Sequence, residues 1–312
     1  MEKEKKQNKT ISKGRKVPWA LYLMMAPGLI YILINNYIPM AGLLLAFKRV
    51  NYGLGIWKSP WVGVENFTYL FQASDALEIF RNTIGYNLAF LVFGTILSIT
   101  VAILLDMVVG KRAKRFYQTV ILIPWLISWV IVSYIVYAFL SGDNGLVNHS
   151  ILRPLGLEPV SWYTTPQYWP VILVLVYLWK SFGYQSIMYY ATLVGIDRTY
   201  YEAAVMDGAS LWQQVRFITL PFLKPTMITL TLLQVGRMFY SDFGLFYQVP
   251  MNSGLLYSTT NTIDTYVYRG LLELNDVGRS SAAGFLQSIL GFVVVLAANW
   301  AVRRLEKDCA LF

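Results

Sequence analysis

Long runs of apolar residues, separated by shorter polar segments, account for most of this 312-residue chain. Six runs reach about 20 residues or more, the length that an α-helix needs to cross the hydrocarbon core of a bilayer. We therefore predict an all-α, polytopic membrane protein with six transmembrane helices. Their predicted ranges are 19–46, 83–109, 117–140, 168–195, 224–247 and 281–302.

Lys and Arg residues gather outside these runs. Seven lie within the first 16 residues, and others lie at 111–115 and 303–307. Because cytoplasmic segments are enriched in Lys and Arg, we predict a multi-pass cell-membrane protein with both termini in the cytoplasm. The first apolar run is longer than the roughly 7–15 residues of a signal-peptide core, so we interpret it as a retained span. The loops expected outside are 48–82, 141–167 and 248–280.

The composition supports a membrane protein and argues against an enzyme. Hydrophobic residues make up 56% of the chain and charged residues 14%, whereas soluble domains contain roughly 25% charged residues. The net charge of +9 comes from the predicted cytoplasmic segments, so nucleic acid is not an expected partner. One cysteine, Cys309, and one histidine, His149, provide neither an intramolecular disulfide nor a multi-histidine metal site. We expect no catalytic residues, no metal and no cofactor bound by this chain.

The segment "EAAVMDGASLWQQVRFITLP", residues 202–221, lies between the fourth and fifth predicted spans. Thr199 and Glu202 fit a T-x-x-E capping box, and Ser210 and Gln213 fit a second one, S-x-x-Q. Each box satisfies free amide groups at the start of a helix. The pattern predicts two short helices that form an elbow on the cytoplasmic side.

Two residues are predicted to divide and end this elbow. Gly208 interrupts the helix, at a cost near 1 kcal/mol relative to alanine. Pro221 is predicted to close the second helix, because it has no N–H to donate and restricts Leu220 before it. From the residues alone, the segment could also be an ordinary amphipathic connection in which Glu202 is only a cap. The apolar positions that recur at helical spacing are Ala204, Val205, Gly208, Leu211, Trp212 and Val215.

The elbow resembles the EAA loop of binding-protein-dependent ABC importer permeases. That pattern is EAA, three residues, Gly, nine residues and I-x-L-P, and every fixed position is matched here. The likeness extends over most of the chain, including "MMAPGLIYILINNYIPM", and is greatest to maltose-type carbohydrate permeases, in a branch that includes permeases for polysaccharide fragments. The matching residues are Glu202, Ala203, Ala204, Gly208, Ile218, Leu220 and Pro221.

The resemblance implies a role for the elbow and a set of partners. The elbow would dock into a cytoplasmic ABC ATPase dimer, with Glu202 making polar contact and Gly208 permitting the bend. ATP and Mg would be bound by that ATPase, since the chain has no G-x-x-x-x-G-K-[ST] loop. A second homologous permease subunit, an extracytoplasmic solute-binding protein, an oligosaccharide and membrane lipid complete the expected partners. The implied division is a basic tail at 1–17, a first helix and loop at 18–82, a core at 83–302 with the EAA loop at 199–221, and a tail at 303–312.

Polar residues within the spans are candidates for a substrate pathway. Charged side chains are expensive in lipid and mark functional positions by default. Aromatic rings pack on pyranose rings, and amides and hydroxyls bond sugar hydroxyls. By their distances from the EAA loop, the candidates match positions that line the sugar site in maltose-type permeases. They are Tyr177, Lys180, Ser181 and Tyr184 on one face of the fourth span, Gln234, Arg237, Met238 and Ser241 on one face of the fifth, and Trp125 in the third.

Other interpretations of these residues remain open. Tyr and Ser also mediate packing between membrane helices. Lys180 could snorkel or pair with an acidic residue, and Asp242 could pair with Arg237. Two cations at similar depth favour an acidic, uronate-containing oligosaccharide, because like charges repel unless an anion lies between them. The alternative function is an ion-coupled secondary transporter of small solutes, which would need acidic relays; Asp106 and Asp242 lie near span ends.

Overall fold

The computed structural model describes residues 19–72, 75–142 and 144–306 of the chain. The predicted basic tail at 1–17, and residues 307–312 of the predicted C-terminal tail, lie outside these ranges. Within them the chain is helical, with one isolated β-bridge between Lys48 and Trp61 and no strand. The predicted all-α class is confirmed.

Five helical segments are long and apolar enough to cross a membrane, and a sixth span results if one bent pair of helices is counted as one. The prediction of six spans is confirmed in this sense. The first segment is built from α1 (Trp19–Ile32), η2 (Leu33–Tyr37), α2 (Ile38–Met40) and η3 (Ala41–Phe47). The others are α5 (Ala76–Met107), the pair α6 (Lys111–Leu126) and α7 (Trp129–Leu140), η6 (Pro166–Tyr168) with α8 (Trp169–Val194), α10 (Leu211–Gln214) with η7 (Val215–Thr219) and α11 (Leu220–Val235), and α14 (Val277–Leu305).

Two predicted spans differ from the structure. The third is broken between α6 and α7, which are bent by 93°. The fifth starts at Leu211 and ends at Val235, so the predicted range of 224–247 is wrong. Pro221 does not close a helix as predicted, because it lies at the second residue of α11, directly after the π-helical turn η7. The π-helical turn η7 connects α10 to α11 without a stop.

Shorter helices connect the spans. α9 (Thr199–Met206) belongs to the elbow, and η8 (Gly244–Gln248) follows the fifth span. The remaining ones are α3 (Gly55–Lys58), α4 (Glu65–Gln72), η4 (Val147–Leu152), η5 (Trp162–Thr164), η9 (Gly254–Leu256), α12 (Tyr257–Thr260) and α13 (Ile263–Leu272).

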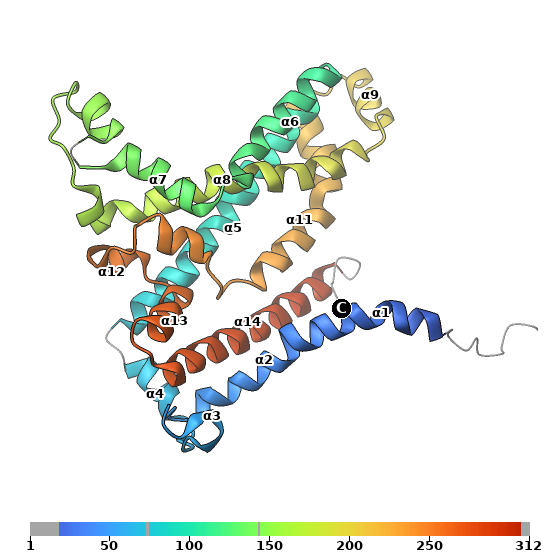
Figure 1. Ribbon diagram of the computed structural model, residues 1–312. Helices are drawn as coiled ribbons and strands as arrows, with labels where there is room; N and C mark the ends of the chain where they lie inside the picture. The colour runs from blue at the N-terminus through green and yellow to red at the C-terminus, as the bar shows by residue number, and fades with distance from the viewer. Residues whose placement is uncertain (1–18, 73–74, 143, 307–312) are drawn as a thin grey trace, which may run out of the picture.

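Helices α5 and α8 form the centre of the molecule (Figure 1). One apolar cluster joins them to α7 and η8 through buried side chains that include Phe90, Trp169 and Phe246. A second cluster lies nearer the elbow and includes Leu193 of α8 and Leu223 of α11. These clusters hold the spans that carry most of the candidate site residues.

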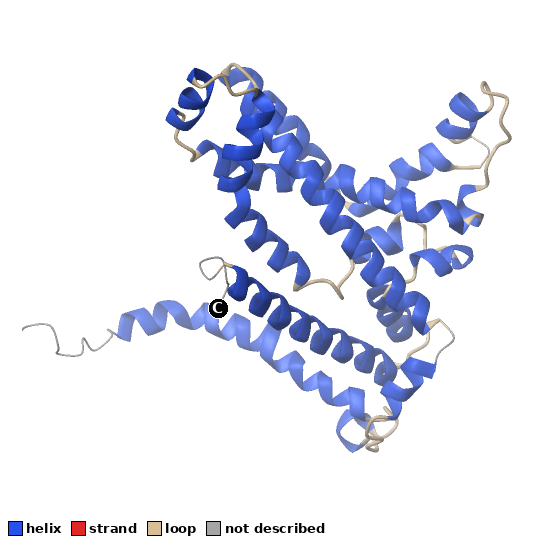
Figure 2. Cartoon of the chain, turned by 180° about the vertical axis from the view of Figure 1, so that it is seen from behind, coloured by secondary structure: helices blue, strands red, loops and turns tan. Residues whose placement is uncertain are grey.

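The first span lies beside α14, away from this centre (Figure 2). Rings of Phe47, Phe67 and Phe285 meet with centroids 5.3–6.0 Å apart and fix one end of the pair. Most of the span beyond this contact is exposed. Its uncovered apolar surface suits contact with lipid or with another subunit.

Candidate coupling elbow and membrane pathway

The first elbow helix, α9, starts from a different residue than predicted. Asp197 Oδ1 accepts a hydrogen bond from the Thr199 backbone N–H at 3.0 Å. Thr199 is already helical and Glu202 lies in the first turn, so the predicted Thr199–Glu202 capping box is wrong. The acceptor two residues upstream supplies the cap instead. The bond from Thr199 lowers the pKa of the Asp197 carboxyl from its ordinary value.

The second elbow helix, α10, has the predicted capping box. The Ser210 N–H donates to Gln213 Oε1 at 2.7 Å, and the Gln213 N–H donates to Ser210 Oγ at 3.4 Å. Gly208 between the two helices has φ +77°, a left-handed conformation that favours glycine. The predicted break at Gly208 is therefore confirmed.

The elbow exposes apolar side chains. Val205, Met206, Leu211 and Trp212 are 61%, 88%, 66% and 68% exposed. Of the predicted stripe, Val205, Gly208, Leu211 and Trp212 are thus left uncovered by this chain, whereas Ala204 and Val215 are half-buried. An exposed apolar patch marks an interaction surface. Among the EAA positions, Ile218 and Leu220 are half-buried, whereas Glu202, Ala203, Gly208 and Pro221 are exposed and Ala204 is half-buried.

An ion pair connects the elbow to the end of α5. Arg198 donates to the two carboxylate oxygens of Asp106 at 2.9 and 2.6 Å. Lys114 of α6 lies 3.9 Å from Asp106 Oδ1. A cavity of about 200 Å³ lies beside this cluster, and its lining includes Tyr201 and Leu211. The sequence did not reveal the ion pair of Arg198, because its partner Asp106 is 92 residues away along the chain.

Lys180 lies inside the molecule, against the break in the third span. Its side chain is buried, and Nζ donates to the carbonyl oxygens of Pro124 at 3.2 Å, Trp125 at 3.0 Å and Ile127. Nζ also lies 5.0 Å from the ring centroid of Trp129. Lys180 therefore is not the uncompensated cation that the sequence suggested, because backbone carbonyls surround it.

The other candidates of the fourth span are divided between packing and exposure. Tyr177 stacks on Phe90 with centroids 3.8 Å apart, and Ser181 is buried. Tyr184 stacks on Trp125 at 4.6 Å, and both rings are more than 40% exposed. The pair Trp125–Tyr184 is thus the accessible part of this predicted face.

The candidates of the fifth span do not share one helical face, so that prediction is wrong. Gln234 lies in the last turn of α11, while Arg237, Met238 and Ser241 follow its end. Arg237 is exposed, Met238 packs in an apolar cluster, and Ser241 donates its hydroxyl to Asp264 at 2.7 Å.

Side chains from three other helices bond the backbone that follows α11. Asn87 donates to the carbonyls of Met238 and Tyr240 at 3.0 Å, from α5. Gln287 of α14 donates to the Phe239 carbonyl at 2.7 Å, and Asp264 of α13 accepts from the Ser241 N–H at 2.6 Å. After Val235 the backbone keeps i→i−3 turn bonds from Arg237, Met238 and Tyr240. The long-range bonds hold this turn in place where the apolar run does not continue as an α-helix.

Asp242 holds the next segment and the third span together. Its Oδ1 accepts from the N–H groups of Gly244 and Leu245 at 3.0 and 3.4 Å, at the start of η8. Its Oδ2 accepts from Trp129 Nε1 at 2.9 Å. Asp242 thus takes N–H donors, and the alternative in which it pairs with Arg237 gains no support from this geometry.

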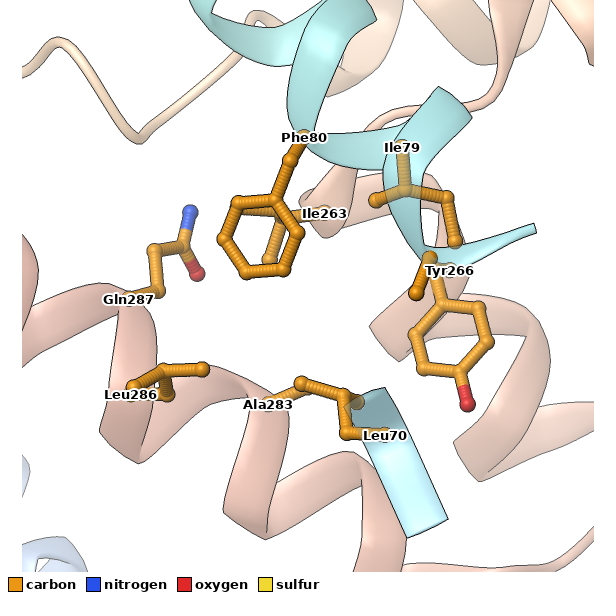
Figure 3. A pocket seen from close by; sticks show the side chains of 9 residues that line it. Leu70, Ile79, Phe80, Ile263, Tyr266, Ala283, Leu286 and Gln287 are labelled. Carbon is orange, nitrogen blue, oxygen red and sulfur yellow. The ribbon is translucent and has the colours of Figure 1, made fainter. Parts of the chain in front are cut away.

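A small cavity lies beside Gln287, between α4, α5, α13 and α14 (Figure 3). Its volume is about 10 Å³, roughly the minimum that one water requires. The side chains around it, such as Leu70, Phe80 and Tyr266, are mostly apolar. It is too small to hold a sugar and does not form part of the candidate pathway.

Comparison with known proteins identifies relatives over nearly the whole chain. The family described as "Binding-protein-dependent transport system inner membrane component" matches residues 77–307. Protein LplB of Bacillus subtilis (strain 168) is 32% identical and covers 98% of both chains. The polygalacturonan/rhamnogalacturonan transport system permease protein YteP of the same organism is 33% identical, over 92% of this chain and 89% of the relative.

Solved structures show the same fold. A chain of a bacterial ABC transporter involved in the import of the acidic polysaccharide alginate is 34% identical, with a TM-score of 0.84 over 92% of this chain and 96% of that one. A chain from a bacterial alginate ABC transporter, in complex with alginate pentasaccharide-bound periplasmic protein, is 33% identical with the same TM-score, over 93% and 96%.

Proposed function

Since this chain belongs to the binding-protein-dependent transport system inner membrane components, we propose that it is the permease subunit that imports acidic oligosaccharides. ATP hydrolysis by a separate subunit drives the import. The observation that carries the transport role is the elbow, whose EAA residues stand beside an uncovered apolar surface. Val205, Met206, Leu211 and Trp212 form that surface, which we call the elbow patch.

The elbow patch docks into a cytoplasmic ABC ATPase dimer, which binds ATP and Mg. Glu202 and Gly208 are exposed next to the patch, and a side-chain atom added at Gly208 would meet nothing of this chain within 4 Å. The Arg198–Asp106 pair then passes movement of the elbow into α5. The surface is open, charged at one edge and apolar at its centre, as a docking site requires.

Two further partners and an orientation belong to the same proposal. A second homologous permease subunit lies beside this one in lipid, and an extracytoplasmic binding protein delivers the sugar. A periplasmic protein bound to alginate pentasaccharide is part of one similar structure. Both termini face the cytoplasm in this proposal, which the basic terminal segments support. Asp106 pairs with Arg198 of the elbow, and Lys224 in the first part of α11 pairs with Glu306 at the end of α14.

The proposed substrate is an oligosaccharide that carries uronate carboxylates. Relatives of this chain are named for polygalacturonan, rhamnogalacturonan and alginate. Arg237 is exposed just after the end of the fifth span, and its planar guanidinium can bind a carboxylate through two hydrogen bonds. Trp125 and Tyr184 offer an accessible aromatic surface to a pyranose ring, and we call this pair the aromatic wall. The remaining residues of the proposed pathway are Tyr177, Ser181, Gln234, Met238 and Ser241.

An ion-coupled transporter is the less favoured alternative. Its candidate relays are Asp106 and Asp242. Asp106 is held by Arg198, and Asp242 by the Trp129 indole. Uptake without ATP by this chain alone would be needed to support it.

Uptake by the reconstituted transporter tests the substrate. An unsaturated uronyl trisaccharide and a neutral trisaccharide are compared in wild type, Arg237→Gln and the control Arg303→Gln, which changes an exposed arginine at the end of α14. We expect wild type to prefer the uronyl sugar. Arg237→Gln should lower uptake of that sugar about tenfold or more, since hydrogen bonds to charged groups contribute about 1.5–3 kcal/mol. Equal loss of both sugars, or preference of wild type for the neutral one, contradicts the proposal.

A further inference from the structure

The break in the third span is held by a side chain from another helix. α6 ends at Leu126 and α7 begins at Trp129. At membrane depth, the free carbonyls of a helix end have no water to bond and need partners from the protein. We propose that Lys180 is a positioning residue that locks this break onto α8, and that it does not bind the sugar.

The hydrogen bonds of Lys180 support this assignment first. An ammonium group has three N–H donors and no acceptor. The carbonyl oxygens of Pro124, Trp125 and Ile127 take these donors. Those carbonyls end α6, where the helix dipole places partial negative charge. The ammonium is thus stabilised by the helix end, and its three N–H donors are taken up by these carbonyls.

Burial points the same way. Only 6% of the Lys180 surface is exposed. A ligand would have to reach the ammonium at the end of the side chain, and this burial prevents it. Nζ lies 5.8 Å from the ring centroid of Trp125 and 5.0 Å from that of Trp129. Rings at these distances attract a cation and cover it. Of the two cations suggested by the sequence, only Arg237 is exposed.

Close packing brings the break within reach of Lys180. Gly183 lies about one turn along α8, and a Cβ added there would stand 1.7 Å from the Ile121 carbonyl oxygen of α6. On the other side of the break, a Cβ at Gly244 would stand 2.1 Å from Trp129. Trp129 also donates to Asp242. The break is therefore a joint between α8, the third span and the segment after α11.

The joint sets the position of the aromatic wall. Trp125 bonds Lys180 through its carbonyl and stacks on Tyr184 through its ring. Loss of the amine removes the donor to the Trp125 and Ile127 carbonyls and releases this ring, whereas the Pro124 carbonyl keeps the Ile127 N–H. The expected effect on uptake rests on the proposed function, because that function gives the aromatic wall its role. The hydrogen bonds of Lys180 to the break do not rest on it. A released wall lowers uptake of charged and neutral sugars together.

The experiment separates a lock from a ligand with two variants in the assembled transporter. Lys180→Met keeps the apolar stem and removes the donors, and Lys180→Gln keeps two amide donors without charge. Uptake of the uronyl and neutral trisaccharides is measured for both. In a Cys309→Ser background, a spin label is attached at Leu126→Cys, where the side chain is 80% exposed, or at the control Val109→Cys, which is 93% exposed.

For Lys180→Met we expect a roughly tenfold fall for both sugars, with their ratio unchanged. The label at position 126 should gain mobility and the label at position 109 should not. Uptake of both sugars by Lys180→Gln should lie between that of Lys180→Met and that of wild type. If Lys180→Met does not assemble, Lys180→Gln alone decides between a positioning role and a ligand role.

Selective loss of the uronyl sugar in Lys180→Gln, with the label at position 126 unchanged, would overturn the proposal and make Lys180 a ligand. If wild type takes no uronyl sugar, the proposed substrate fails, and the label at position 126 still decides the role of Lys180. An unchanged label in both variants counts against the lock whatever the sugar.

Discussion

The elbow and the third span each contain a helix break, and they satisfy its open backbone groups in different ways. In the elbow, Ser210 and Gln213 bond each other's N–H groups, and Gly208 supplies the turn. All three lie within six residues of sequence. In the third span, the carbonyls are bonded by Lys180, 53 to 56 residues away. The start of α7 has a local cap as well, since Ser128 Oγ accepts from the Ile131 N–H at 3.4 Å. What depends on another helix is the carbonyl end of α6, where no water is available inside the membrane.

A second break and a loop extend the comparison. The backbone after α11 is bonded by Asn87, Asp264 and Gln287, each from a different helix. In the loop after the first span, Lys48 repeats the arrangement of Lys180. It is buried, it donates to the carbonyls of Ile56 and Trp57 at 3.1 and 2.8 Å, and it lies near a tryptophan ring. A buried lysine at a helix C-terminus is thus a recurrent structural element of this chain.

The largest effect is expected from Gly183→Ala, which tests the break inside the membrane. Its Cβ would overlap the Ile121 carbonyl, so α6 must move from α8 and lose Lys180. Overpacking costs about 1–3 kcal/mol, and we expect the unfolding midpoint of the purified transporter to fall accordingly. The control is Gly284→Ala in α14, where the added atom meets nothing within 4 Å. A midpoint for Gly183→Ala equal to that of the control would show that the contact is not tight.

A smaller effect on stability is expected at Gly208, where the break faces water. Its φ is +77°, which costs an L-residue roughly 1–2 kcal/mol, but there is open space around it. Both Gly208→Ala and Gly208→Trp should insert in the membrane. Gly208→Trp should lose ATP hydrolysis stimulated by the binding protein, because the indole occupies the docking surface, while Gly208→Ala keeps part of it. Normal stimulation in Gly208→Trp would mean that the elbow is not the coupling point.

The smallest effect is expected at the cap of α9. The Thr199 N–H holds the pKa of Asp197 below its ordinary value. A lowered folded-state pKa means that the cap contributes fully above the unfolded pKa near 3.9 and is lost as pH falls through the lower folded value. Hydrogen exchange at the start of α9 should therefore rise only in acid below about pH 4. Asp197→Asn keeps an acceptor that does not titrate, so the same acid-induced rise in this variant would contradict the assignment.

The sequence predicted the features that depend on neighbouring residues. The Ser210–Gln213 box and the turn at Gly208 are written within one short segment, and the apolar runs locate the spans. The Thr199–Glu202 box was wrong because Asp197 offers a nearer acceptor. The effect of Pro221 was misjudged because a π-helical turn precedes it and allows α11 to begin there.

The apolar pattern did not show the two breaks inside the membrane, although Pro124 and the cap Ser128 flank the first of them. The third and fifth apolar runs continue through them, so hydrophobic pattern alone predicts unbroken helices. Whether a helix ends there is decided by distant donors and acceptors such as Lys180, Asn87 and Asp264. The same long-range bonds explain why Lys180 resembled a pathway residue in the sequence and is a buried donor in the structure.

The elbow patch also bears on how many copies of this chain a cell can keep. Val205, Met206, Leu211 and Trp212 remain exposed whenever no docking partner covers them. Uncovered apolar surface promotes aggregation, and cells continuously remove proteins that expose it. Under the proposed assembly, a copy made in excess of the ATPase is therefore short-lived. The supply of the cytoplasmic subunit then sets the number of transporters in the membrane.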